Sequence, residues 1–400
     1  MQTGQVIRES VARQDPVTGR RIWQLTQAGE WNMTPWYHRD VCFDRSSRFL
    51  YAATLREGVC HLVRFSVEDR SGVVLASWAQ TPELSDTFRF MHSSAGGFVT
   101  VHAERQIINV DGDSGEQTVV VSDLGEDYRV RGVCPGLDGS HVIFTRSPSL
   151  RQKGITDRLG LGELYRAYTE HFGGIPTDFV RLDLATGAEE IVHHEPQAGC
   201  DHIHPGPQDG DEWLIDLNFP PLYSWYGDDG QTTRCWLLDT RTGTKREMRP
   251  RNANRFQMHG SWSGDGSLIF YHGRDKETGT PIGQTGGGHY IGAIRRDGEV
   301  VWERVFPDLH YGHVCPHPRR NTILLNGGLT ADLLLELDFA DSGSSGVPRL
   351  DILCRHGSAV KIGGIATYPS PHVSPDGRWL AFHAFDGQRT DLFLLELEEG

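Results

Sequence analysis

The sequence predicts an all-β fold, a seven-bladed β-propeller with a helical insertion in the third blade. Three observations support this prediction: a turn-and-strand pattern recurs along the chain, 47 Gly and 20 Pro supply many turns, and only one stretch resembles a helix. A hydrophobic content of 38% with 23% charged residues is sufficient for a buried core. Because the blades of a propeller bury their faces against one another in a closed ring, we expect residues 1–400 to form a single domain.

The recurring unit is clearest at 261–273 (SWSGDGSLIFYHG) and 372–397, where a Ser-x-Asp-Gly turn leads into a strand. The glycine supplies a positive-φ turn residue, and the flanking β-branched and aromatic runs are typical of strands. Weaker copies occur at residues 41–54, 91–103, 133–146, 204–217 and 314–327. Second strands with acidic turns follow at 179–190, 235–247 and 333–341.

Residues 155–171 form the one convincing helical stretch, and it falls between two strands of the third unit. We expect the ring to close by pairing of the two chain ends, with residues 21–27 as an outer strand beside 392–397, since an unpaired edge invites aggregation. A pair of β-sandwiches or a solenoid is the alternative architecture.

Composition excludes several functional classes. A net charge of −14 argues against nucleic-acid binding, and no apolar run approaches the length of a membrane span. The N-terminal residues lack the apolar segment of a secretory signal. Seven cysteines, an odd number without paired spacing, indicate free thiols and a cytoplasmic protein.

Histidines recur at equivalent positions of successive units. When the units are aligned on Trp262, His259 lies three residues upstream, and residues just before the turn belong to the innermost strand, which lines the channel. Allowing one-residue slips, the matching positions are His202, His313 and Ser370, with His204 and His372 at a neighbouring position. A cluster of imidazoles suits a general base or a metal site, although any one of the 19 histidines could be an ordinary buried residue.

Arg234, in TTRCWLLDT, is the candidate cation. A guanidinium on the channel wall would bind a carboxylate, whereas the alternative is a surface charge beside Asp239. The loop 218–230 carries Tyr223, Trp225 and Tyr226, which could stack on a sugar or simply pack within the loop.

Several familiar motifs are absent. The Gly-rich segment 283–290 lacks the lysine and the strand-to-helix context of a phosphate loop. There is no Gly-x-Ser-x-Gly nucleophile elbow, which argues against a propeller-containing serine peptidase, and no Cys-x-x-Cys pair for structural zinc.

The chain resembles the oligogalacturonate lyase family, cytoplasmic seven-bladed propellers that cleave short pectin-derived uronides by β-elimination. The resemblance runs along most of the chain, and its more specific part is the ordered series of His-x-x-Trp, Arg-x-Trp and a histidine in the last blade. The segments that carry it are 19–51, 179–192, 200–207, 234–243 (RCWLLDTRTG), 259–271 (HGSWSGDGSLIFY) and 368–387.

The resemblance implies that His259 is the Brønsted base and Arg234 the group that assists it. It also implies a divalent metal, usually manganese, bound through three His and one Gln, with His313 and His372 on two of these positions. The other two positions fall on Ser370 and near Thr367, a change that should weaken manganese binding.

The leading functional hypothesis is therefore a lyase acting on an acidic, uronic-acid-containing oligosaccharide, with His202, His204 and Tyr223 contacting the substrate. A second is a non-catalytic propeller that binds sugars or proteins and descends from a lyase. A third is a glycoside hydrolase, which would need two carboxylates, and only Asp40 and Asp201 stand at channel-facing positions.

Overall fold

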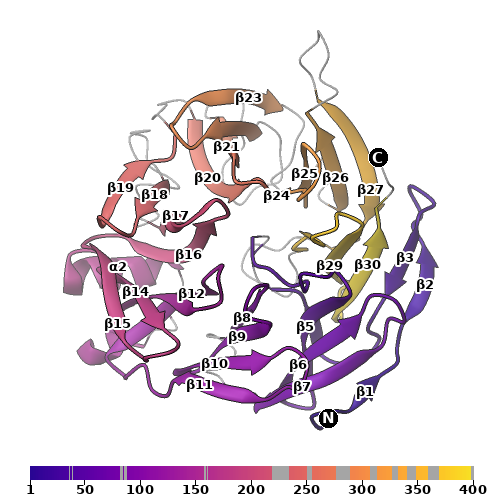
Figure 1. The fold of residues 1–400 in the computed structure, drawn as a ribbon, viewed down its shortest axis with the longest axis horizontal. Helices are drawn as coiled ribbons and strands as arrows, with labels where there is room; N and C mark the ends of the chain where they lie inside the picture. The colour runs from indigo at the N-terminus through magenta and orange to yellow at the C-terminus, as the bar shows by residue number, and fades with distance from the viewer. Residues whose placement is uncertain are drawn as a thin grey trace.

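A computed structural model shows antiparallel sheets arranged in a ring around a central axis (Figure 1). It describes residues 1–35, 37, 39–81, 84, 88–156, 159, 161–218, 234–249, 255–275, 289–306, 313–326, 332–339, 348–358 and 369–397. Within these residues the strands form one ten-stranded sheet and five four-stranded sheets. The all-β propeller predicted from the sequence is confirmed.

Five blades are separate meanders in which consecutive strands pair with one another. The second contains β8 (Arg89–Ser93), β9 (Phe98–Ala103), β10 (Gln106–Asp111) and β11 (Gln117–Val121). The third contains β12 (Tyr128–Pro135), β13 (His141–Pro148), β14 (Thr177–Asp183) and β15 (Glu189–Glu195). The fourth contains β16 (Gly199–Gly206), β17 (Asp209–Asn218), β18 (Cys235–Asp239) and β19 (Thr244–Glu247). The fifth contains β20 (Arg255–Trp262), β21 (Leu268–Asp275), β22 (His289–Arg295) and β23 (Val300–Phe306). The sixth contains β24 (Val314–Pro316), β25 (Thr322–Leu325), β26 (Leu333–Asp338) and β27 (Arg349–Arg355).

The ten-stranded sheet joins the two ends of the chain. One part contains β1 (Val6–Ile7), β4 (Trp31–Met33), β5 (Phe49–Arg56), β6 (Val59–Ser66) and β7 (Gly72–Ala79). The other contains β2 (Val11–Gln14), β3 (Arg21–Gln24), β28 (His372–Val373), β29 (Trp379–Phe385) and β30 (Thr390–Glu396). A single parallel residue pair, Thr390 with Trp31, links the two parts. We number these two parts as the first and the last blade, and the total of seven blades stays a prediction.

The expected closure of the ring is present. Ile22, Trp23 and Gln24 of β3 pair antiparallel with the C-terminal strand β30. The N-terminal strand thus completes the blade built from the last residues of the chain, so no open edge remains between these two segments.

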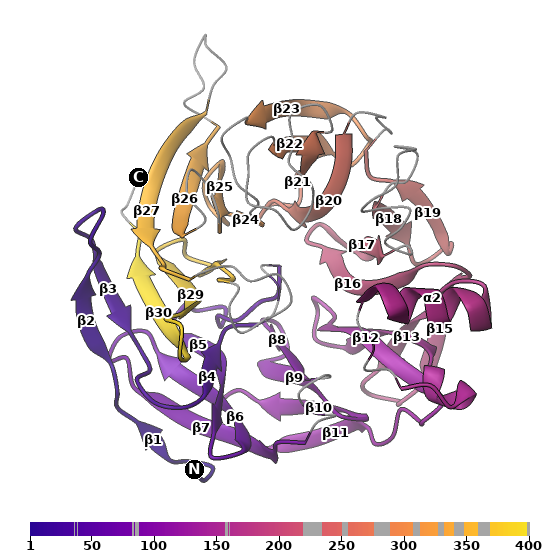
Figure 2. The same cartoon turned by 180° about the vertical axis from the view of Figure 1, so that it is seen from behind.

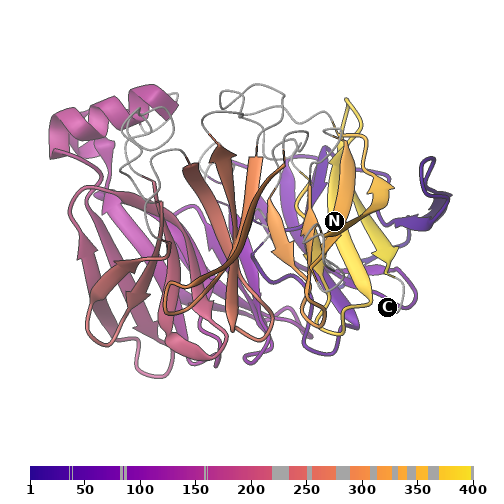
Figure 3. The same cartoon turned by 90° about the horizontal axis from the view of Figure 1, so that it is seen from above.

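The helical insertion lies where the sequence predicts it, between β13 and β14. It consists of the short 3₁₀ helix η1 (Leu150–Lys153) and α2 (Leu161–Phe172). Seen from behind and from above, α2 projects from one face of the ring rather than joining a blade (Figures 2 and 3). Leu150, Leu164, Tyr165, Tyr168 and Ile175 form the small apolar core that holds it there.

The Ser-x-Asp-Gly turns have the predicted conformation. Gly266 and Gly377 adopt φ of 69° and 78°, in the left-handed region that glycine tolerates. In the fifth blade the Ser263 hydroxyl donates to Asp265 at 2.7 Å and accepts from the Leu268 amide at 3.0 Å. The turn is therefore locked by its own side chains, which fixes the register of β20 against β21.

The hydrophobic core lies between neighbouring blades. Leu214 and Leu237 of the fourth blade pack with Trp262, Ile269 and Tyr271 of the fifth. The Trp262 indole also donates a hydrogen bond to the His204 carbonyl at 3.1 Å. This contact joins the innermost strands of the two blades, and it holds their channel-facing residues in a fixed relation.

Candidate functional site

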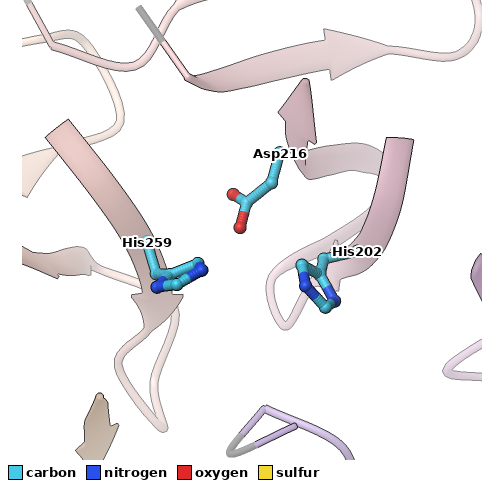
Figure 4. Close-up of side chains that lie close together, drawn as sticks. All are labelled: His202, Asp216 and His259. Atoms are coloured by element: carbon cyan, nitrogen blue, oxygen red, sulfur yellow. The ribbon is translucent and has the colours of Figure 1, made fainter. Parts of the chain in front are cut away.

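Two histidines from adjacent blades face one another across a buried aspartate. His202 lies on β16 opposite Asp216 on β17, and His259 lies on β20 opposite His272 on β21. Ligating atoms of His202, Asp216 and His259 all lie within 4.8 Å of one another. Figure 4 shows the Asp216 carboxylate directed between the two imidazoles.

A β-bulge precedes each of these histidines. The register of β16 with β17 shifts between Cys200 and His202, and that of β20 with β21 shifts between Gln257 and His259. A bulge adds one residue to a strand, bends it and increases its twist, and bulges are common beside active sites. Here the bulge gives His202 and His259 equivalent positions in consecutive blades.

Tyr37, between β4 and β5, contacts this cluster. The Tyr37 ring stacks on the His202 imidazole with centroids 3.7 Å apart and planes 7° apart. Its edge meets His259 at 5.2 Å and His313 at 5.5 Å. Three predicted channel histidines therefore gather around one tyrosine.

Asp216 is completely buried and is held by three donors. Arg39 Nη2 donates to its Oδ2 at 2.8 Å, the Tyr37 hydroxyl to the same oxygen at 3.3 Å, and Cys235 Sγ to Oδ1 at 3.1 Å. Arg39 is equally enclosed, with its side chain 2% exposed. Burial opposes the charge of Arg39, but the combined attraction of Asp216 and other nearby groups outweighs it and holds the Arg39 pKa above its usual value.

The imidazoles of the cluster are kept neutral. Burial lowers the pKa of His259 well below 6.5, and the Arg234 charge lowers it further. Burial and the Arg39 charge act in the same way on the pKa of His202. The pKa of His313 falls to about 3, through burial and then Arg234. Neutral imidazole is the form that can accept a proton near neutral pH.

His259 and His272 are hydrogen-bonded, with His259 Nδ1 3.1 Å from His272 Nε2. Both rings are buried. One nitrogen must donate and the other accept, so this bond decides which nitrogen of His259 carries its proton. When His259 Nδ1 is the donor, the lone pair at Nε2 is the one available for a reaction.

Arg234 lies immediately before β18 and is buried, not on the surface beside Asp239 as one sequence interpretation allowed. Its carbonyl accepts from the Leu217 amide at 2.8 Å, which continues the sheet by one pair and fixes the backbone next to Asp216. Its charge lowers the pKa values of His259, His202 and His313, so its guanidinium lies within electrostatic range of the imidazole cluster.

The remaining predicted residues lie around the cluster or outside the described chain. His204 is half-buried on β16, and burial followed by the Arg39 charge lowers its pKa to about 3. Burial, then His383, lowers the His372 pKa to about 3, and the backbone groups near it are those of Pro35 and Asp40. Ser370 is buried. Tyr223 and Thr367 fall outside the described residues, as do Trp225 and Tyr226.

The residues present fit a divalent metal poorly. Imidazole nitrogen and carboxylate oxygen are suitable donors for manganese, and His202, Asp216 and His259 supply both. However, the one carboxylate is already neutralised by Arg39, and Arg234 adds a second cation beside His259. An added dication would face two guanidinium groups, so the local charge favours an anion instead. The assignment of His313 and His372 as metal ligands stays a prediction.

Sequence reasoning missed Tyr37, Arg39, Asp216 and His272. Asp216 offered a signal, because an acidic residue within the apolar run WLIDL must be paired if that run is buried. His272 offered a similar one within IFYHG. Arg39 and Tyr37 lie in a loop whose partner Asp216 is 177 and 179 positions away in sequence, and no periodicity reveals such a contact.

Searches with known protein-family patterns and among curated protein sequences find no match to this chain. Solved structures do match its fold. An oligogalacturonate lyase from Vibrio parahaemolyticus aligns with a TM-score of 0.78 at 16% identity, over 100% of this chain and 99% of that one. An oligogalacturonate lyase in complex with manganese aligns with a TM-score of 0.76 at 17% identity, over the same shares. A chain of the mitotic checkpoint complex aligns less well, with a TM-score of 0.53 at 14% identity, over 95% of this chain and 94% of that one.

The chain is therefore an all-β propeller protein with a histidine-rich channel. Its fold is the one found in oligogalacturonate lyases, and the resemblance seen in the sequence is confirmed at the level of the fold. None of the helices in the part that the structure describes has the length and apolar character needed to cross a bilayer.

Proposed function

We propose that the protein is a lyase that cleaves uronic-acid-containing oligosaccharides by β-elimination. The observation that carries this proposal is the buried, neutral imidazole of His259 beside the Arg234 cation. A base and a positive charge at one point are what proton abstraction next to a carboxylate requires. The fold shared with two oligogalacturonate lyases supports the same reaction class.

In the proposed reaction, His259 Nε2 takes the proton from the sugar carbon α to the carboxylate. The electron pair of that C–H bond moves into the carboxylate, and Arg234 stabilises the resulting enolate charge. The charge then returns to form the new C=C bond as the glycosidic C–O bond breaks. The departing oxygen leaves with that bond's electron pair and takes a proton from a donor or water, so atoms and charge balance.

His272 can select the tautomer of His259 that this mechanism needs. His259 can act as a base at Nε2 only if its proton sits on Nδ1, and His272 Nε2 at 3.1 Å can accept that proton in a hydrogen bond. His272 is therefore a positioning residue, while His202, His204 and Tyr223 are the proposed contacts of the acidic sugar. The seven buried free cysteines support the proposal of a cytoplasmic protein.

The direct test is to follow the ultraviolet absorbance of an unsaturated uronate while the protein is incubated with a panel of uronides. His259→Ala should lower kcat by about 10²- to 10⁴-fold. His61→Gln is a matched control, because His61 is also a fully buried histidine but lies on β6 and pairs with Ser77 on β7, in the first blade. Its kcat should be unchanged.

Three outcomes contradict the proposal. Absence of product with every uronide would favour a sugar- or protein-binding propeller without catalysis. An unchanged kcat in folded His259→Ala, with a lowered melting temperature, would make His259 a structural residue. Release of a saturated sugar would indicate hydrolysis, with Asp40 and Asp201 as the acids to test.

A further inference from the structure

The guanidinium of Arg39 has donors that no residue in the described part of the chain satisfies. Its Nη2 pairs with Asp216, but Nε and Nη1 are buried and have no hydrogen-bond partner among those residues. Leaving a buried charged donor unsatisfied costs the full desolvation penalty of that group, so each such group in a native structure calls for an explanation. Arg39 is therefore a candidate binding group that lacks its ligand.

Arg39 stands beside the candidate base. Its Cζ lies 4.7 Å from the centroid of the Tyr37 ring, and that ring contacts His202 and His259. Asp216 connects the same groups, since its carboxylate binds Arg39 and also lies within 4.8 Å of the His259 and His202 nitrogens. The guanidinium and the imidazole thus flank one region of the channel.

The charge in this region selects an anion. Asp216 pairs with Arg39, and Arg234 brings a second guanidinium whose charge acts on His259. Dry surroundings strengthen the attraction of both guanidinium groups for a carboxylate. The same charges repel a divalent cation.

We propose, building on the proposed function, that Arg39 binds the carboxylate of the uronate that reacts, and that no divalent metal is needed to hold it. The remaining N–H groups of Arg39 donate to the carboxylate while Nη2 stays on Asp216. Arg234 then stabilises the charge that develops during proton removal, so the two arginines divide ground-state binding and transition-state stabilisation.

The test measures binding, so that it does not depend on turnover. The His259→Ala protein serves as the parent, and calorimetry gives the Kd of a saturated galacturonate disaccharide in the presence of a chelator. Introducing Arg39→Gln into this parent protein should raise the Kd of the disaccharide by about 10- to 100-fold, as expected for loss of a charged hydrogen bond. Arg64→Gln is the control, because Arg64 on β6 pairs with the exposed Asp113 between β10 and β11, and it should leave Kd unchanged.

A second variant separates binding from folding. Arg39→Gln alone leaves Asp216 as a buried unpaired charge and should lower the melting temperature. The double variant Arg39→Gln/Asp216→Asn removes both charges and leaves no buried carboxylate without a partner, so it should recover stability while Kd stays high. If Kd returns to the parent value in the double variant, Arg39 is only a counter-ion and the proposal is overturned.

The same binding measurement, repeated with manganese, tests whether a metal is needed. Manganese added to the parent should leave Kd unchanged, whereas binding that appears only with manganese overturns the proposal, as does a parent that binds no uronide. If the wild-type protein makes no unsaturated product but Arg39→Gln still weakens binding, the lyase proposal fails and the Arg39 carboxylate site stands.

Discussion

Replacing Arg234 with glutamine removes the cation that, after burial, does most to keep His259 unprotonated. Two effects follow from the same change. The enolate formed during elimination loses a buried positive charge, and removing one such group from an active site costs about 10²- to 10³-fold in kcat. The pKa of His259 rises, because protonating its ring no longer places two cations side by side.

The pH dependence of kcat/KM distinguishes these effects. In the wild-type protein the pKa of His259 lies well below 6.5, so the rate should stay level from neutral pH through about pH 6.5 and fall only at lower pH. We call the fall of kcat/KM at low pH the acid limb. In Arg234→Gln the acid limb should move to higher pH. Its midpoint should remain below the pKa of a free imidazole, since burial still opposes protonation of His259.

Arg234→Lys serves as the control in this experiment. It keeps the charge but loses the planar guanidinium, so the acid limb should stay in place while kcat falls by a smaller factor. An acid limb that does not move in Arg234→Gln, despite a lower kcat, would refute the electrostatic contact between Arg234 and His259. A limb near pH 6.5 in the wild-type protein would refute the neutral, buried base.

Three further predictions concern the surroundings of the site. His272→Leu should lower kcat about 10²-fold at unchanged KM, and His272→Gln, whose amide oxygen can accept from His259 Nδ1, should restore most of the rate in steady-state assays. Burial raises the pKa of Asp40 to about 7, so its stabilising effect is present below its unfolded value of 3.8 and is lost as pH rises through 7. Urea unfolding of Asp40→Asn should therefore show a gain of up to about 4 kcal/mol over wild type at pH ~8 and little change at pH ~4. His204, His313 and His372 have pKa values lowered to about 3, so the folded state keeps them neutral while the unfolded state takes up protons. Each should reduce the free energy of unfolding by about 1.4 kcal/mol per pH unit below pH ~6.5, measured by urea unfolding across that range.

The parts of the fold that repeat were predictable from the sequence. The Ser-x-Asp-Gly turns, the alternating strands and the helix between β13 and β14 each rest on local patterns, and the structure contains all of them. Ring closure through residues 21–27 was predictable because both chain ends carry strands that need a partner. These features depend on neighbours in sequence or on a general rule about strand edges.

The candidate site was only half predictable. His202, His259 and His313 share a repeat position, and they do converge. Arg39 and Tyr37 belong to no repeat, and they reach Asp216 and His202 across the channel. Their partners are set by how the ring closes, which is a property of the whole chain. The metal assignment of His313 and His372 came from the family resemblance, which carries no information about the charges brought in by the loop, and it stays a prediction.

The one-residue slips needed to align the histidines have a structural cause. Bulges interrupt β12 between Val130 and Val133, β16 between Cys200 and His202, and β20 between Gln257 and His259. Each adds residues to an inner strand, so counting back from the turn does not return identical positions in every blade. In the fourth and fifth blades the residue after the bulge is a histidine facing a polar partner, Asp216 or His272.

The third blade shows that the bulge alone does not make a site. Its residue after the bulge is Val133, which faces Phe144, while the bulge itself carries Arg131, paired with Asp201 of the next blade at 3.4 Å. The same β-bulge therefore precedes an apolar contact in the third blade and candidate site residues in the fourth and fifth. What makes the fourth and fifth blades a candidate centre is the set of side chains placed on that backbone, a neutral base between two buried arginines. This charge arrangement favours a carboxylate substrate over a metal ion, and it is the feature that the Arg39 and Arg234 variants test independently.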